Sequence, residues 1–229
     1  MSRRALSYAQ IAGLMPAHRT IGRLSLYRRL LHALLKSGNE TVHSHQLASL
    51  ADVTAAQVRR DLMVVGRSGT PRRGYNVRDL IDGIGAVLDA PMTQGAALVG
   101  AGNLGRALLT FFRGRRPKLS ITAAFDVEPA KIGQVIYGCR CYPVEELERI
   151  VAEKGIRVGI VTVPASEAQH IADALVRAGV KGIVNFAPVP LHVPAGVYVE
   201  HVDVTMSLEK VAFFARQNGL ATGPPAEQT

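Results

Sequence analysis

The sequence predicts an α/β protein made of two parts, a helical N-terminal segment followed by a doubly wound parallel sheet. After residue 91, short apolar segments alternate with amphipathic ones, as is typical of a parallel sheet with helices on both faces. Between residues 21 and 90 the apolar residues recur mostly at helical spacing. Among residues 1–90, 13 basic residues outnumber 6 acidic ones. The two parts therefore differ in both fold and charge.

The composition excludes several classes of protein and of binding site. The chain has 229 residues, of which 48% are hydrophobic and 20% charged, so it can bury a core and is not globally disordered. No run of 18 apolar residues occurs, which excludes a membrane span, and no secretory signal is recognisable. Two cysteines are too few for a disulfide framework or a four-cysteine zinc site. We expect a cytoplasmic protein that binds no metal.

The net charge of +9 is concentrated in the first 90 residues, which carry +7 of it. Such asymmetry indicates that this part meets a polyanion. A solvated basic surface without a partner explains the charge alone equally well.

The N-terminal part begins with a flexible arm at residues 1–20, which show no periodicity. Apolar residues then recur at helical spacing up to a glycine cap at Gly38. Two short helices follow, separated by a three-residue break, and a fourth helix closes the segment before Pro91. The three predicted helices after the glycine cap are Ser44–Leu50, Ala55 to about Val65, and Val77–Asp89. Ser44 and Thr54 are the predicted N-caps, and Gln57 completes a capping box with Thr54.

The helices either side of the three-residue break resemble a helix-turn-helix, whose second helix enters the major groove. On that helix Arg59 and Arg60 could contact phosphate or guanine, and Gln57 could read adenine. We expect these three residues and Asp61 to lie on the solvent side. The basic loop of residues 66–74 fits a wing that grips the DNA backbone. The alternative is an ordinary helical hairpin with a solvated charged face.

The C-terminal part reads as strands and helices in alternation. The predicted strands are Ala96–Gly100, Leu119–Phe125, Val158–Val163, Gly182–Phe186 and Val197–Val202. The predicted helices are Asn103–Phe112, Val144–Lys154, Ser166–Ala178 and Met206–Gln217. The chain ends in a polar, Pro- and Gly-containing tail that we expect to be disordered.

The strongest motif is the run Gly100, Ala101, Gly102, Asn103, Leu104 and Gly105, which links a predicted strand to a predicted helix. In that context glycines let the backbone approach a pyrophosphate at the helix N-terminus, as in a Rossmann fold. Asp126 ends the next strand, where a carboxylate accepts hydrogen bonds from ribose hydroxyls and repels a 2′-phosphate. The sequence therefore predicts NAD(H) rather than NADP(H). The alternative is a glycine turn that only packs.

No constellation for hydrolysis or proton transfer accompanies this motif, so we expect no catalytic residues and a cofactor that is sensed rather than turned over. Cys139 and Cys141 lie in a further predicted strand or at its edge, with both side chains on one face. A redox pair is conceivable, but a bridge across one residue is strained, so two reduced thiols are the expected state.

Taken together, the motifs resemble those of the Rex family, the redox-sensing transcriptional repressors of bacteria. The resemblance spans about residues 20–217. It rests on the motifs RLSLYRRLL (23–31), TAAQVRRDL (54–62), RGYNV (73–77), VGAGNLG (99–105), AFD (124–126), TVPA (162–165), GIVNFAPV (182–189) and HVD (201–203).

The resemblance implies a homodimer that binds an inverted-repeat DNA operator and is released by NADH. It implies a winged-helix domain over residues 21–90, a Rossmann domain over 91–204, a swapped dimerisation helix over 205–218 and a disordered tail over 219–229. The cofactor residues it implies are Gly100, Ala101, Gly102, Asn103, Leu104, Gly105, Asp126, Lys131, Thr162, Val163, Pro164, Asn185, Ala187, Pro188 and Asp203. The DNA-binding residues are Ser44, Thr54, Gln57, Arg59, Arg60, Arg67, Arg72, Arg73 and Tyr75, and the switch residues are Arg29, Phe111 and Asp203.

The chain departs from the family pattern at Phe111, where members usually carry a tyrosine, and at Pro71, where a basic residue is usual. Loss of the phenol hydroxyl predicts weaker discrimination between NADH and NAD⁺.

Two other functions stay open on the residues alone. One is a small NAD-dependent oxidoreductase, and the other is a CoA-binding module. Asp126 argues against CoA, because a carboxylate suits ribose hydroxyls better than a 3′-phosphate.

Overall fold

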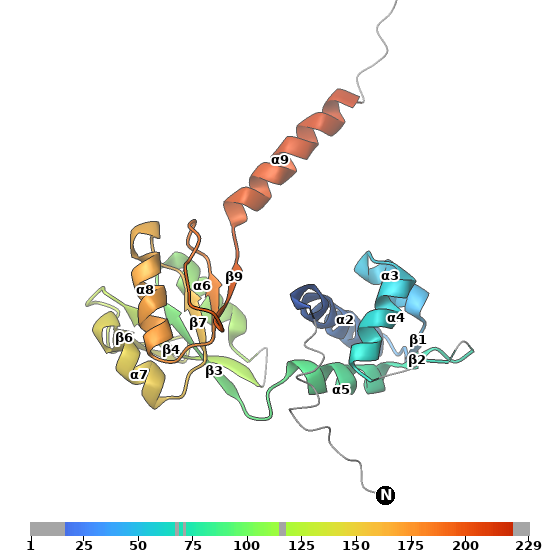
Figure 1. Ribbon diagram of the computed structural model, residues 1–229, viewed down its shortest axis with the longest axis horizontal. Coiled ribbons are helices and arrows are strands. Elements are labelled where there is room, and N and C mark those ends of the chain that lie inside the picture. The colour runs from blue at the N-terminus through green and yellow to red at the C-terminus, as the bar shows by residue number, and fades with distance from the viewer. Residues whose placement is uncertain (1–16, 67–68, 71, 115–117, 222–229) are drawn as a thin grey trace, which may run out of the picture. The chain divides into compact units, whose positions relative to one another are not determined.

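The computed structural model describes residues 17–66, 69–70, 72–114 and 118–221. The chain forms two compact units, Met1–Pro91 and Met92–Thr229, each of which is described by itself (Figure 1). The boundary predicted between residues 90 and 91 lies one residue from this division. Most of the predicted arm and tail, residues 1–16 and 222–229, lie outside the described residues. No helix among the described residues is long and apolar enough to cross a membrane.

The described residues of the first unit form four helices and a small sheet. Its helices are α2 (His18–Lys36), α3 (Ser44–Ala51), α4 (Ala55–Val64) and α5 (Val77–Leu88). The strands β1 (Thr41–Val42) and β2 (Tyr75–Asn76) pair antiparallel, and an isolated bridge joins Thr70 to Gly74. The sequence pattern predicted all four helices and missed both strands, which are too short to show a periodicity. Residues 18–20, predicted to belong to the arm, are helical.

The core of this unit is formed by apolar residues from all four helices. Buried together are Leu24, Tyr27, Leu31, Val42, Leu47, Ala48, Ala51, Val58, Leu62, Val77, Leu80 and Ile84. Leu24, Tyr27 and Leu31 follow each other at helical spacing on α2, as the sequence predicted. The contacts fix α3 and α4 against α2 and leave the opposite face of α4 to solvent.

The second unit is a seven-stranded sheet in the order β5-β6-β4-β3-β7-β8-β9. All neighbouring strands are parallel except β5 and β6, which form an antiparallel hairpin at one edge. The strands are β3 (Gln94–Val99), β4 (Leu119–Asp126), β5 (Val135–Ile136), β6 (Cys139–Pro143), β7 (Val158–Val161), β8 (Gly182–Asn185) and β9 (Tyr198–His201). The chain runs outward from β3 through β4 to β6 and then returns to β7, so the order reverses beside β3.

Helices cover both faces of the sheet, which confirms the predicted doubly wound α/β class. Ala97 and Val99 of β3 pack in one cluster with α7 (Leu147–Glu153) and α8 (Ala165–Arg177). Ala96 and Leu98 pack in the other cluster, with α6 (Asn103–Phe112). The predicted helix Val144–Lys154 is in fact a 3₁₀ turn, Val144–Glu146, followed by α7.

The chain continues into a long final helix, α9 (Val204–Ala221). It begins two residues before the predicted start, and residues 219–221 extend it into what the sequence predicted to be a disordered tail. Every side chain from residue 204 to residue 217 is exposed. The exposed residues include large apolar ones, namely Val204, Met206, Leu208, Val211, Phe213 and Phe214.

Candidate functional sites

The glycine-rich loop lies at the carboxyl end of β3, where the strand order reverses. This is the position at which open α/β sheets bind their ligands. Gly100 has φ 96°, and a Cβ there would lie 2.6 Å from the Thr162 carbonyl oxygen. A Cβ at Gly105 would lie 2.1 Å from the Gly100 carbonyl oxygen. Both positions therefore require glycine, because loop, helix and neighbouring strand approach too closely for a side chain.

The surroundings of Gly102 are different, since a Cβ built there meets no atom within 4 Å. Gly102 is the N-cap of α6, and no side chain caps that helix. The first N–H groups of α6 therefore remain available to an anion, with the positive end of the helix dipole behind them. This cradle of backbone and open space fits a pyrophosphate.

Asp126 ends β4 beside this loop and is 8% exposed. Its Oδ2 accepts hydrogen bonds from the Ala101 N–H at 2.8 Å and the Lys131 ammonium at 3.1 Å, and Oδ1 accepts one from the Glu128 N–H at 2.9 Å. Burial raises the pKa of this carboxyl, but these three donors outweigh it and hold the pKa below its ordinary value. The carboxylate is thus ionised and fixes the glycine-rich loop.

Lys131 is held between two carboxylates. Its ammonium lies 2.7 Å from Glu128 Oε2 and 3.1 Å from Asp126 Oδ2. The hydrogen bond to Glu128 is the main reason why the pKa of Lys131 is raised. The sequence patterns did not single out Glu128, which lies two residues after the acid that ends the strand.

Six further predicted cofactor residues lie at the ends of β7 and β8. The Thr162 hydroxyl lies 2.9 Å from the Val99 carbonyl oxygen and 2.8 Å from that of Gly100, so it fastens β7 to the loop. Asn185 is buried and organises its own loop, since it accepts from the Ala187 N–H and donates to the Val189 carbonyl. Ala187 is buried, Val163 is partly buried, and Pro164 and Pro188 are exposed.

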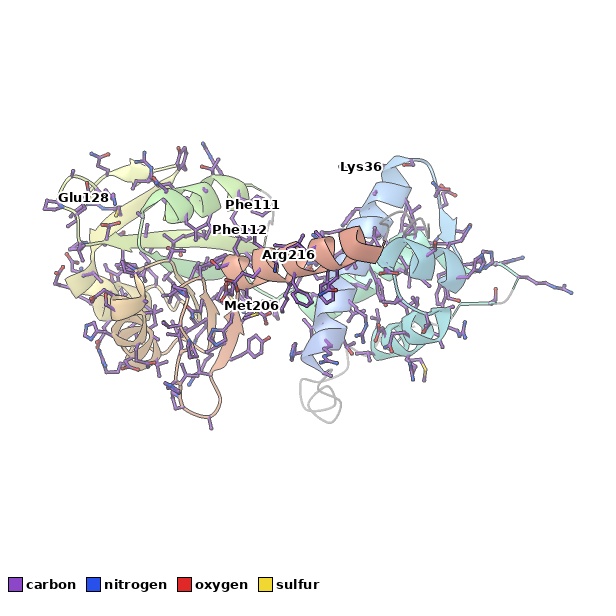
Figure 2. All side chains as sticks on the ribbon, turned by 90° about the horizontal axis from the view of Figure 1, so that it is seen from above. Lys36, Phe111, Phe112, Glu128, Met206 and Arg216 are labelled. Carbon is purple, nitrogen blue, oxygen red and sulfur yellow. The ribbon has the colours of Figure 1, made fainter. Side chains whose placement is uncertain are left out.

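The predicted switch residues are distributed over both units. Arg29 is exposed on α2, and Asp203 lies immediately before α9. The Asp203 carboxylate accepts a hydrogen bond from the Met206 N–H at 2.8 Å and so caps that helix. Phe111 is exposed on α6, with its ring edge-to-face against Phe112 at 5.2 Å between centroids (Figure 2). A pairing of Arg29 with Asp203 stays a prediction.

In the first unit, α3 and α4 are joined by Asp52, Val53 and Thr54, as a helix-turn-helix requires. Asp52 adopts the left-handed conformation with φ 52°, which makes the sharp turn. The Thr54 hydroxyl accepts from the Gln57 N–H at 3.1 Å and caps α4 as predicted. The predicted capping box is wrong, because the Gln57 side chain bonds to Asp61 and Arg60 instead of to the Thr54 backbone. His43, not Ser44, is the N-cap of α3, and its N–H donates to the Gln46 side chain.

The outer face of α4 presents Ala56, Arg59, Arg60 and Met63, which recur at helical spacing and are exposed. Arg59 donates to the Ser44 hydroxyl on α3 at 3.2 Å. Of the residues predicted on the solvent side of this helix, Arg59 and Arg60 lie on this exposed face, whereas Gln57 is partly buried.

The loop after α4 returns as a short hairpin closed between Thr70 and Gly74, with Arg72 and Arg73 exposed and Tyr75 on β2 partly buried. This arrangement has the shape of a wing. Arg67 and Pro71 lie outside the described residues.

The structure contradicts the predicted position of Asp61. It was expected on the solvent side of α4, yet it is 2% exposed. Its carboxylate accepts hydrogen bonds from Arg23 (2.6 and 2.8 Å), Tyr27 (2.9 Å) and Gln57 (2.9 Å). Burial raises the pKa of Asp61, but the donors, Arg23 first, outweigh it and lower the pKa. Arg23 and Tyr27 at i, i+4 on α2 were the available indication of a polar partner.

Cys139 and Cys141 lie on the same face of the sheet, as predicted, and both are buried free thiols. Burial raises the pKa of Cys139 to about 11 and also raises that of Cys141. Thiols in this state are weak nucleophiles at neutral pH. Among the described residues, no group of three or more His, Cys, Asp or Glu side chains could hold a metal ion.

Comparison with known families matches each unit separately. Residues 16–62 match a family described as "Putative DNA-binding protein N-terminus", and residues 93–189 match the CoA binding domain family.

Whole-chain relatives are more informative. The redox-sensing transcriptional repressor Rex of Carboxydothermus hydrogenoformans is 44% identical over 87% of this chain and 96% of its own length. The Rex of Desulforamulus reducens is 43% identical over 85% of this chain and 92% of its own.

Two solved structures resemble the chain along nearly its whole length. RSP, a Rex-family repressor, in complex with β-NAD⁺ and operator DNA gives a TM-score of 0.83 at 33% identity, covering 94% of this chain and 99% of that one. RSP in complex with β-NADH gives 0.79 at 34% identity, covering 90% and 97%.

Proposed function

The chain belongs to the Rex family of redox-sensing transcriptional repressors, and from that premise we propose that it binds an inverted-repeat DNA operator as a homodimer and leaves it when NADH binds. The observation that carries the proposal is the presence of two different sites on one chain. The first unit presents arginines on a helix-turn-helix, and the second presents a glycine cradle next to a buried, ionised aspartate.

In the DNA site, α4 would enter the major groove with Arg59 and Arg60 on its outer face. Ser44 and Thr54 at the helix starts and Arg72, Arg73 and Tyr75 around the wing would hold the phosphate backbone, with Arg67 in the same loop. Phosphate contacts of this kind release counterions, so affinity should fall steeply with salt.

In the cofactor site, the loop from Gly100 to Gly105 would hold the pyrophosphate on the free N–H groups of α6. Asp126 would accept from the adenine ribose hydroxyls, because a carboxylate has further lone pairs beyond the three donors it already meets. Lys131 lies within the same cluster. The ends of β7 and β8, from Thr162 to Pro164 and from Asn185 to Pro188, would line the nicotinamide half.

The switch would lie where the nicotinamide half meets α9. NAD⁺ and NADH differ by one ring charge, and a carboxylate such as Asp203 is suited to read that difference. Asp203 also caps α9, so a change at the ring would reach this helix directly. In the DNA-binding state Asp203 would pair with Arg29 instead.

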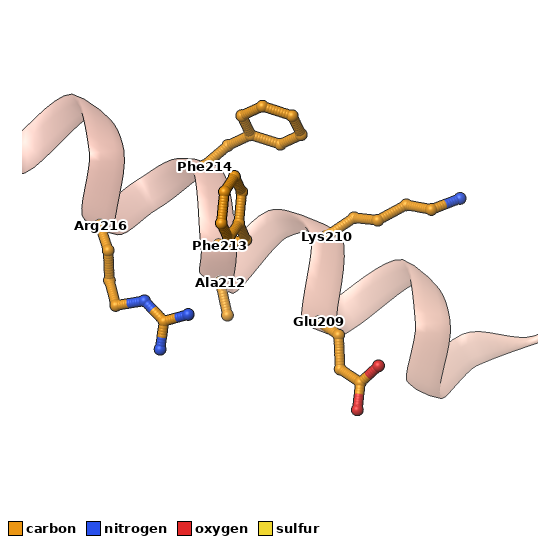
Figure 3. Close-up of a pocket in the computed structure, with 6 residues that line it drawn as sticks. All are labelled: Glu209, Lys210, Ala212, Phe213, Phe214 and Arg216. Carbon is orange, nitrogen blue, oxygen red and sulfur yellow. The ribbon is translucent and has the colours of Figure 1, made fainter.

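The homodimer is supported by the exposed apolar residues of α9, which a terminal helix must bury somewhere. Figure 3 shows Phe213 and Phe214 projecting from this helix among Glu209, Lys210, Ala212 and Arg216. A second copy of the chain would cover them. Sedimentation of Val211→Glu with Phe214→Glu should then give monomers where the unaltered protein gives dimers.

Members of this family are repressors rather than enzymes, which sets aside the oxidoreductase reading. The match to the CoA binding domain family favours CoA as a second candidate ligand. Asp126 fits ribose hydroxyls better than the 3′-phosphate of CoA, whose charge it would repel. Because its proposed ligands, a DNA operator and NAD(H), are found inside the cell, we propose a cytoplasmic location for the chain.

The test is binding of the full chain to a library of palindromic duplexes at fixed salt, followed by titration with NADH, NAD⁺ or CoA. We expect a dimer-sized protein–DNA complex that dissociates on addition of NADH and stays intact with NAD⁺. Binding that ignores NADH, or responds to CoA instead, would contradict the proposed ligand, and no binding at any moderate salt would contradict the repressor.

Phe111 provides a second test of the same switch. Because it lacks the usual phenol hydroxyl, we expect the unaltered protein to distinguish NADH from NAD⁺ less strongly than Phe111→Tyr does. An unchanged or smaller preference for NADH in Phe111→Tyr would count against a role of this position.

A further inference from the structure

We propose that Asp61 and Gln57 form a relay that positions Arg60 for DNA, and that Gln57 contributes to operator recognition through Arg60 rather than by reading a base. The inference rests on the proposed DNA-binding function. It makes Asp61 and Gln57 positioning residues, with Arg60 as the group that touches DNA.

The relay starts at a fixed point in the core. Asp61 accepts hydrogen bonds from two nitrogens of Arg23, from the Tyr27 hydroxyl and from Gln57. Arg23 and Tyr27 belong to α2, whereas Asp61 and Gln57 belong to α4. The carboxylate therefore locks the recognition helix to α2, and its position does not depend on solvent.

The relay continues through both ends of the Gln57 amide. Its Nε2 donates to Asp61 Oδ1 at 2.9 Å, and its Oε1 accepts from Arg60 Nη2 at 2.9 Å. An ionised carboxylate can only accept, so Asp61 must face the NH₂ group and the carbonyl oxygen is left for Arg60. A glutamine that reads adenine uses both ends on the base. Gln57 would have to break both internal bonds to do so.

The relay ends on an exposed guanidinium. Arg60 carries five N–H donors in a fixed fork, of which Gln57 engages one group, so most of the fork remains for DNA. A long side chain held in one orientation loses less conformational entropy on binding. Gln57 should thus increase operator affinity through Arg60 alone.

Arg59 offers a matched control. It is also exposed on the same helix, but its contact is the Ser44 hydroxyl on α3 at 3.2 Å, outside the relay. Loss of the Gln57 side chain also leaves the cap of α4 intact, because Thr54 accepts from the Gln57 backbone N–H. Gln57→Ala therefore tests the relay without removing the cap.

The experiment is a pair of double-mutant cycles on the full chain, with operator affinity measured by fluorescence anisotropy at fixed salt. One cycle combines Gln57→Ala with Arg60→Ala, and the other combines Gln57→Ala with Arg59→Ala. Thermal unfolding of each variant verifies that it is folded. We expect Gln57→Ala alone to weaken operator binding about 3- to 10-fold. It should cause no further loss of affinity when Arg60 is already alanine, whereas its fold-loss should multiply with that of Arg59→Ala.

Multiplicative effects in the Arg60 cycle would overturn the proposal, and so would coupling of equal size in both cycles, which would indicate a general effect on α4. No effect of Gln57→Ala alone would overturn it as well. A changed base preference in Gln57→Ala that Arg60→Ala does not share would show direct reading. Failure of the proposed function looks different, since the unaltered protein would then bind no operator.

Discussion

The two units each contain a buried aspartate at the centre of a hydrogen-bond network, and the two networks differ in how complete they are. Asp61 receives four hydrogen bonds, all from side chains, and is 2% exposed. Asp126 receives three, two of them from backbone N–H groups, and is 8% exposed at the carboxyl edge of the sheet. A carboxylate offers about four acceptor positions. Asp61 is therefore saturated by the protein, while Asp126 keeps capacity for a ligand.

This difference distinguishes a structural carboxylate from one that can also bind a ligand. Asp61 acts within the protein, where it fixes the recognition helix, and a ligand cannot reach it. Asp126 fixes the glycine-rich loop through Ala101 and still faces the place where a ribose would lie. An ionised, buried carboxylate alone does not distinguish the two roles, whereas the count of its internal donors does.

The largest expected effect is on the saturated site. Asp61→Asn leaves the Arg23 guanidinium without its counter-charge and replaces one acceptor oxygen by an NH₂ donor, which then faces groups that also donate. Breaking a buried pair from one side costs several kcal/mol, and since Arg23 is partly exposed we expect roughly 3 kcal/mol of unfolding free energy in the first unit. Denaturant unfolding measures it. Asp82→Asn, at an exposed position on α5, is the control and should change little. Equal losses in both variants would contradict the network's importance.

The second effect concerns the open site. Asp126→Asn removes the charge that accepts from ribose hydroxyls, and hydrogen bonds to charged groups contribute about 1.5–3 kcal/mol. We expect NADH affinity to fall about 10- to 100-fold by calorimetric titration. Operator affinity without cofactor should be unchanged, because Asp126 belongs to the other unit. An unchanged NADH affinity would remove Asp126 from the cofactor site.

Acid should weaken the saturated network in a defined direction. The pKa of Asp61 is lowered in the folded protein, so its contribution is present above the ordinary carboxyl pKa of about 4 and is lost as the pH falls toward the folded value. The difference in unfolding free energy between the unaltered protein and Asp61→Asn should therefore shrink below about pH 4. A difference that stays constant down to pH 2 would contradict this account.

A smaller effect is expected at Glu128, which pairs with Lys131 next to Asp126. Glu128→Gln removes one of the two carboxylates that hold this lysine, so that more of its charge acts on a 2′-phosphate; a partly exposed pair of this kind contributes at most about 1 kcal/mol. We expect NADPH binding to improve up to about fivefold while NADH binding stays the same. The comparison of both cofactors in one titration series measures it, and an equal change for both would count against a role in specificity.

The smallest effect is expected at the two cysteines. Because burial raises the pKa of Cys139 to about 11 and that of Cys141 in the same direction, both thiols should react slowly with iodoacetamide at pH 7.5 in the folded protein. Reaction should become fast on unfolding. Fast reaction in the folded state would revive the redox-pair interpretation.

The sequence predicted the fold well wherever apolar periodicity was long. The helices of the first unit and the parallel strands of the second carry such patterns. The glycine motif and Asp126 were predicted instead from residue type and position after a strand. It failed at two-residue strands such as β1 and β5, which are too short for a period to appear. It also failed at Asp61, since a charged residue on a helix is expected outside unless its partners are known. Those partners come from α2, 34 and 38 positions earlier in the chain.

The residues of the proposed cofactor site and its surroundings were predicted unevenly for a related reason. Gly100 and Gly105 follow from local backbone needs, so the motif is sufficient to find them. Asn185 and Thr162 came from the family resemblance, and their role in joining loops to strands depends on contacts that only the fold creates. Glu128 had no pattern of its own.

The central claim is that the DNA site and the cofactor site of this chain are coupled, and reciprocal binding tests it most directly. NADH affinity is measured on the full chain with and without saturating operator duplex, and operator affinity with and without saturating NADH. Linkage requires both affinities to fall by the same factor, which we expect to be 5-fold or more, in the usual range of about 5- to 150-fold. An NADH affinity that DNA leaves unchanged would contradict the account, whatever each site binds alone.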